Sequence, residues 1–214
     1  MGKQRQLTKR ESVRMEELKK KEEQLREQGF TRVNLTVGIV AANILAVLIM
    51  LPFILIDILA FVMVNEKGEF SFFHENPLYT FLILIVFLIC IVLHELIHGA
   101  VWGACAPGHF KDIEFGIIWS ALTPYSTCKS ELKRYQYIIG AVMPTVILGF
   151  LPGVIAALTG SGGILFISVF MILGGGGDFL IIGKLLAYRG KGKEYVILDH
   201  PSELGLIVFE RPLS

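Results

Sequence analysis

The amino-acid sequence predicts an all-α polytopic membrane protein with about four transmembrane helices. Hydrophobic residues make up 53% of the 214-residue chain, and the mean hydropathy is +0.61, which is high for a soluble domain. The apolar residues gather in long runs, which favours a lipid bilayer as their solvent. The net charge of +1 gives no reason to expect a nucleic-acid partner. We interpret the three cysteines, Cys90, Cys105 and Cys128, as free thiols because no CxxC pair is present.

Four apolar segments are predicted to span the membrane, at residues 33–64, 77–106, 135–159 and 164–188. Pro52 should kink the first of them. The segment 107–134 is too polar to cross, and we expect it to lie at the membrane surface, with a short strand or β-hairpin as one option. The expected organisation is a charged cytosolic helix at 1–32, a transmembrane domain at 33–188 and a cytosolic polar tail at 189–214.

Basic residues predict the orientation. Of the 20 Lys and Arg residues, only Lys67 falls in the two predicted outer loops, and the others fall on the opposite side of the spans. Because Lys and Arg concentrate in cytoplasmic segments, we expect a multi-pass protein of the cell membrane with both termini in the cytosol.

The second apolar segment contains the motif His94-Glu95-Leu96-Ile97-His98. Residues four apart on a helix share one face, so the two imidazoles can converge on one metal ion. Glu95 stands beside the first histidine, where it can act as a general base toward water. This pattern predicts a Zn²⁺ cofactor with His94 and His98 as ligands and Glu95 as the catalytic residue. The alternative without a metal is that the helix ends at Leu93 and these ionisable groups meet the lipid headgroups. Apolar sequence resumes after the motif, which argues against this alternative.

Depth within the predicted membrane spans indicates Asp178 as the third metal ligand. At about 1.5 Å per residue, His94 lies about 25 Å from the outer start of its span and Asp178 about 21 Å from the start of its own. Four glycines precede Asp178 and permit close approach of another helix or a metal. The competing interpretation is that the Asp178 carboxylate is satisfied by a neighbouring hydroxyl or by Lys184. The other candidates fit less well: they are His109 in the cytosolic segment, His200 in the tail, His74 in an outer loop and Asp57, for which a polar contact between helices is favoured.

At HELIHG (94–99) and Gly177-Asp178 the chain resembles the small bacterial putative zincin peptidase family, a domain of unknown function. The resemblance covers about residues 77–206 and also touches Phe115-Gly116, Thr123-Pro124-Tyr125, Tyr137 and 199–205. More distantly the layout is similar to the site-2 protease class of intramembrane metalloproteases. That resemblance implies His94, His98 and Asp178 as ligands and Glu95 as base. Here GGGGDF replaces the proline-containing Asn…Asp-Gly signature of that class, so its regulation and substrates do not carry over.

The expected function is therefore hydrolysis of peptide bonds near the cytosolic face by a membrane-embedded zinc metalloprotease acting on a membrane-associated or transmembrane peptide. Tyr125, His109 and Tyr137 are the candidates for stabilising the oxyanion. Two alternatives stay open: a non-hydrolytic metal-binding membrane protein, such as a transporter or sensor, and a structural assembly protein. A transporter would usually show related halves, and the sequence shows no internal repeat.

The orientation can be tested by cysteine labelling in a variant without native thiols. A cysteine at Gly68 should react with an impermeant reagent added outside intact cells, because the basic residues place that loop outside. Cysteines at Gly2 and Ser214 should react only after the membrane is opened. The reverse pattern contradicts the topology.

Overall fold

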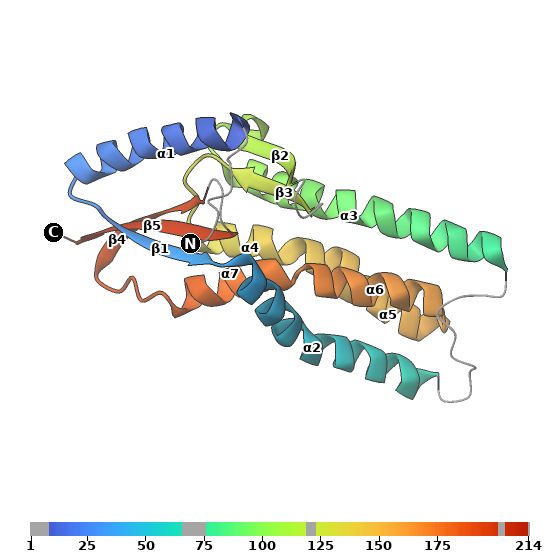
Figure 1. Ribbon diagram of the computed structural model, residues 1–214. Coiled ribbons are helices and arrows are strands. Elements are labelled where there is room, and N and C mark those ends of the chain that lie inside the picture. The colour runs from blue at the N-terminus through green and yellow to red at the C-terminus, as the bar shows by residue number, and fades with distance from the viewer. Residues whose placement is uncertain (1–8, 66–75, 119–122, 201–203, 214) are drawn as a thin grey trace.

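The computed structural model describes residues 9–65, 76–118, 123–200 and 204–213 and is mostly helical (Figure 1). Within this part of the chain, four helical segments are long and apolar enough to cross a membrane. They correspond to the four predicted spans and are listed here: Val40–Val64, Pro77–Cys105, Arg134–Thr159 and Gly162–Ala187. The predicted outer loop with His74 lies almost wholly outside the described residues.

Two of the long segments are interrupted. The first two are the helices α2 (Ile39–Val64) and α3 (Pro77–Cys105). The third consists of α4 (Arg134–Pro144), a π-helical turn (Thr145–Phe150) and α5 (Leu151–Thr159). The fourth consists of α6 (Gly162–Gly174) and α7 (Gly176–Ala187), which meet at Gly175. Proline within a helix and π-turns are the usual causes of such irregularities, and both occur in the third segment.

The outer faces of α2 and α3 are apolar and open. Only 11% of the most hydrophobic window of each helix is buried inside the protein. Large aliphatic side chains are exposed along both, among them Ile56 at 65%, Leu88 at 57% and Val92 at 58%. A continuous apolar surface of this kind is unfavourable in water and suits a bilayer.

A small sheet closes one end of the helices. It contains β1 (Thr31–Val37), β5 (Leu204–Pro212) and β4 (Lys193–Asp199), all antiparallel, with β5 in the centre. Figure 1 shows the sheet at the end of the bundle opposite the α2–α3 connection, with α1 (Lys9–Glu27) across it. Side chains alternate along β5: Leu206 and Val208 belong to the core shared with the bundle, whereas Ile207 and Phe209 pack in the core beneath α1. The sheet is thus packed on both faces.

The sheet corrects three predictions: the chain is not all-α, the first span does not begin at residue 33, and the tail is not simply polar. Residues 31–37 form a strand because Val33 and Leu35 alternate with polar residues and turn toward the core at the end of the bundle. This short alternating segment adjoins the apolar run of α2, so hydropathy alone predicted a single span over both segments. The tail contains the apolar run of β5, whose central place buries it on both faces.

The predicted β-hairpin between the second and third spans is present. Strands β2 (Ile113–Ile118) and β3 (Thr123–Cys128) pair antiparallel, after a 3₁₀ turn at His109–Asp112. The hairpin lies against α3, where glycines make room for it. A Cβ at Gly99 would lie 2.3 Å from the Phe115 ring, and one at Gly103 would lie 3.1 Å from Phe110. These two glycines therefore accommodate the hairpin segment. The contact holds β3 beside the His-Glu motif.

Candidate metal centre

The structure brings His94, His98 and Asp178 together. Asp178 Oδ2 lies 3.3 Å from His94 Nε2 and 3.4 Å from His98 Nε2. One candidate ligand atom from each residue lies within 4.8 Å of the others. The histidines are one turn apart on α3 and almost fully buried, at 7% and 3% exposure. The juxtaposition expected from depth along the two helices is therefore confirmed.

Asp178 owes its place to the break between α6 and α7. It lies in the first turn of α7, where the unpaired N–H groups and the helix dipole favour a carboxylate. The glycines before it let other elements approach: a Cβ at Gly175 would lie 2.0 Å from Thr145 Oγ1, and one at Gly176 would lie 2.7 Å from Ala46. The competing partner, Lys184, instead donates to the backbone oxygen of Thr36 at 2.7 Å.

The orientation of His98 is fixed by a backbone carbonyl. Its Nδ1 lies 2.9 Å from the oxygen of Gly140 on α4. That oxygen is available because the residue one turn later is Pro144, which has no N–H to complete the helical hydrogen bond. Nδ1 can bond to this carbonyl only as a donor, so in the neutral imidazole the lone pair is on Nε2, the nitrogen that faces Asp178. The proline in this span thus has a direct consequence for the candidate site.

A stack of aromatic rings extends from His98 toward the sheet. The imidazole stacks on Trp102 at 4.9 Å between centroids, and Trp102 stacks on Tyr137 at 5.2 Å. Trp102 Nε1 donates to the backbone oxygen of Tyr137, and the Tyr137 hydroxyl donates to Asp199 Oδ1 at 3.0 Å. The other Asp199 oxygen accepts from the Cys128 amide at 3.2 Å. Burial raises the pKa of Asp199 to about 6, against these two hydrogen bonds, which lower it.

Glu95 points to the hairpin side of α3. Its carboxylate interacts with His98, His94 and Asp178 and lies within hydrogen-bonding reach of the backbone amide of Ser126 on β3. A regular helix turns about 100° per residue, so the neighbour of a ligand histidine faces sideways from it. The acid is therefore adjacent to the three-residue group without being part of it.

The three side chains fit a zinc ion by their donor chemistry. Two imidazole nitrogens and one carboxylate oxygen form a ligand set that catalytic zinc uses, with a position left for water or substrate. The tautomer of His98 set by Gly140 is the one that leaves Nε2 free to coordinate. Without a metal, three ionisable groups would share a buried site with few other hydrogen bonds, which is unusual in an apolar bundle.

The remaining candidates have other environments. Asp57 accepts a hydrogen bond from Ser168 at 2.7 Å, the helix–helix contact that was expected for it. His109 is exposed at the start of the 3₁₀ turn, and His200 follows β4. Of the three candidates for oxyanion stabilisation, Tyr137 already donates its hydroxyl to Asp199, and the Tyr125 ring lies under the Arg14 guanidinium at 5.0 Å. The three cysteines are free thiols, as predicted.

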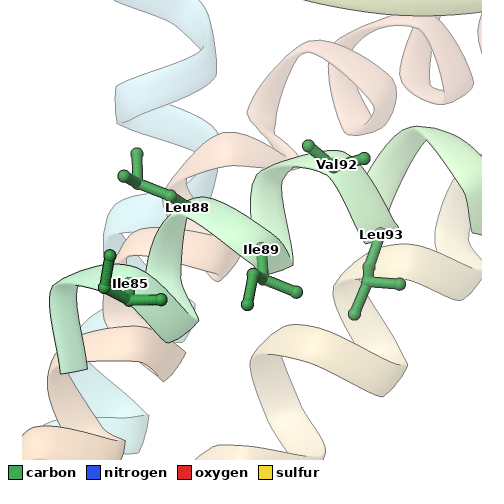
Figure 2. A pocket seen from close by; sticks show the side chains of 5 residues that line it. All are labelled: Ile85, Leu88, Ile89, Val92 and Leu93. Carbon is green, nitrogen blue, oxygen red and sulfur yellow. The ribbon is translucent and has the colours of Figure 1, made fainter. Parts of the chain in front are cut away.

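A shallow apolar groove lies on α3 just before the motif. Figure 2 shows its five aliphatic side chains, all from this helix: Ile85, Leu88, Ile89, Val92 and Leu93. They offer no ligand and no base, so the groove contributes apolar surface on α3 and no chemistry of its own.

Comparison with known proteins agrees with the motif. Residues 87–191 match the model of a family described as "Putative zincin peptidase", which confirms the resemblance to that family. The matched range runs from the middle of α3 past the end of α7 and contains all four residues of the site. Searches of the curated proteins and of the solved structures found no match.

Gly140→Ala should weaken zinc binding. A Cβ there would lie 2.0 Å from Trp102 Nε1. The rigid Trp102 indole would have to move to avoid it, and this indole is the ring that stacks on His98. We expect a loss of zinc affinity of about tenfold or more, measured by chelator competition. Gly183→Ala on α7 is the control, because nothing lies within 4 Å of its added methyl. Equal affinities in the two variants would contradict the role of Gly140.

Proposed function

We propose that this chain, whose residues 87–191 match the zincin peptidase model, is a membrane-embedded zinc metalloprotease. The observation that carries the proposal is the convergence of His94, His98 and Asp178 on one point, with Glu95 beside them on the same helix. The exposed apolar faces of α2 and α3 support a place within a bilayer.

In this proposal the three residues would hold the metal, and the protein's own groups would move the protons. A zinc ion so held supplies Lewis acidity, which polarises the scissile carbonyl and acidifies water. Glu95 accepts the proton of the attacking water and then delivers it to the leaving nitrogen. The Ser126 amide holds the Glu95 carboxylate in place between these two steps.

The hairpin indicates how a substrate would lie. Pro124 has no N–H, so its pair with Ile117 must be one of the non-hydrogen-bonded pairs of the ladder. Because such pairs alternate along an antiparallel ladder, Ser126 and Cys128 also turn their backbone groups away from β2. The contacts agree: the Ser126 amide reaches Glu95, and the Cys128 amide donates to Asp199. One edge of β3 therefore faces the motif.

An extended peptide suits this edge. The outward carbonyls of Pro124 and Ser126 can accept hydrogen bonds from a peptide that adds to β3 as a further strand. A helical transmembrane segment has no free N–H groups to offer there and would have to unwind first. We therefore propose as substrate an extended or locally unwound segment of a membrane-associated or transmembrane peptide. It is cleaved near the cytosolic face of a cell membrane in which both termini of the enzyme are cytosolic.

Glu95→Gln should retain zinc and lose hydrolysis. The carboxylate is outside the ligand group, so metal content should stay at the wild-type level, whereas loss of the base should slow cleavage about 10²–10⁴-fold. The measurement is zinc content by mass spectrometry, together with cleavage of a fluorogenic peptide by the protein in detergent. A variant that keeps both zinc and wild-type activity would favour a non-hydrolytic metal-binding protein with a contaminating protease.

Asp178→Ala should lose most bound zinc, because two neutral imidazoles alone leave a divalent charge uncompensated in an apolar site. Asp57→Ala is the matched control: it removes the same side chain from another helix of the bundle, where the carboxylate contacts Ser168 and not the histidines. Zinc content after dialysis separates the two. Retention of zinc by Asp178→Ala would exclude Asp178 as a ligand.

A further inference from the structure

Among the buried side-chain atoms without a hydrogen-bond partner in the described residues are His94 Nδ1 and Thr145 Oγ1. Thr145 has no exposed surface, and His94 is 7% exposed. An unpaired buried donor or acceptor is costly, and most such groups in folded proteins are paired. Histidines that bind metals almost always donate their second N–H to a neighbour, as His98 does to Gly140.

The packing of α3 against α4 places these two atoms at the same level. The helices run antiparallel, with Trp102 against Tyr137 and His98 against Gly140. Further along, Cys90 and Leu148 share one buried cluster. His94 lies one turn before His98 on α3. In an antiparallel pair the residue facing it therefore lies about one turn after Gly140, at residues 144–145. Residue 144 is a proline, so of these two residues Thr145 is the one with a side-chain hydroxyl.

A separate contact places Thr145 next to the Asp178 segment. Its Oγ1 would be 2.0 Å from a Cβ at Gly175, three residues before Asp178. The hydroxyl thus lies where α3, the π-turn and the α6–α7 break come together. The missing side chain at Gly175 leaves room for this hydroxyl.

We propose that the Thr145 hydroxyl accepts the Nδ1 hydrogen of His94 when the metal is bound. Threonine in a helix populates two χ1 wells, and the proposed bond uses the well that turns the hydroxyl toward α3. The bond would fix the tautomer in which His94 Nε2 carries the lone pair, the same state that Gly140 imposes on His98. Thr145 is then a positioning residue for a ligand, and the inference rests on the proposed zinc site.

The test compares the zinc affinity of Thr145→Val and Thr145→Ser in the full chain, by chelator competition in detergent. Valine keeps the shape and removes the acceptor, so affinity should fall about 10–100-fold; serine restores the hydroxyl and should bind close to wild type. The absorption spectrum of the Co²⁺-substituted protein should change in the valine variant and not in the serine variant.

Ser168→Ala is the control for a purely structural effect. Ser168 is another fully buried hydroxyl of the bundle, bonded to Asp57 and to the Gly149 oxygen, so its loss should lower the melting temperature and leave zinc affinity unchanged. Wild-type affinity in Thr145→Val overturns the inference. Equal losses of affinity in Thr145→Val and Ser168→Ala also overturn it. Absence of zinc binding by the wild type overturns instead the proposed function.

Discussion

The bundle is organised by the need to bury three ionisable side chains in apolar surroundings. His94, His98 and Asp178 would each be costly alone at membrane depth, but they lie within 4.8 Å of one another and can share one metal. The contacts within this group connect α3 to α7. The two irregular points of the bundle, the π-turn after Pro144 and the break at Gly175, both lie beside it. The irregularities therefore serve the site: Pro144, just before the π-turn, leaves a carbonyl free for His98, and the break places Asp178 in the first turn of α7.

The sequence was sufficient to predict the group of His94, His98 and Asp178, because the position of a residue along a predicted membrane span gives its depth. The spacing of His94 and His98 places them on one face of α3 without any tertiary information. Asp178, 84 residues beyond His94, could be matched to them because each predicted span starts at a recognisable outer edge and rises by a fixed amount per residue. The hairpin could also be predicted, since residues 107–134 are too polar to form a fifth span.

The supporting contacts could not be predicted in the same way. Asp199, Tyr137 and Trp102 lie on β4, α4 and α3 and meet only in the folded chain. The sequence did not predict the sheet for two reasons. Strand β1 adjoins α2 without a polar break, and β5 is a short apolar run without the alternation of polar and apolar residues that indicates a strand. One signal was available and unused: a proline inside a span leaves the carbonyl four residues earlier unpaired. Applied to Pro144, that rule points to Gly140 as an acceptor.

The three-stranded sheet is also part of the support of the candidate site. The matched family range ends at residue 191, before β4 and β5. Yet Ile197, Leu206 and Val208 from these strands pack in the same core as Trp102 and Tyr137, and Asp199 holds the Tyr137 hydroxyl. Trp102 stacks on His98, so a shift of the sheet would displace the ring against which a candidate ligand rests. The segment beyond residue 191 therefore belongs to the same packing unit as the His-Glu motif, even though it contributes none of the three candidate ligands.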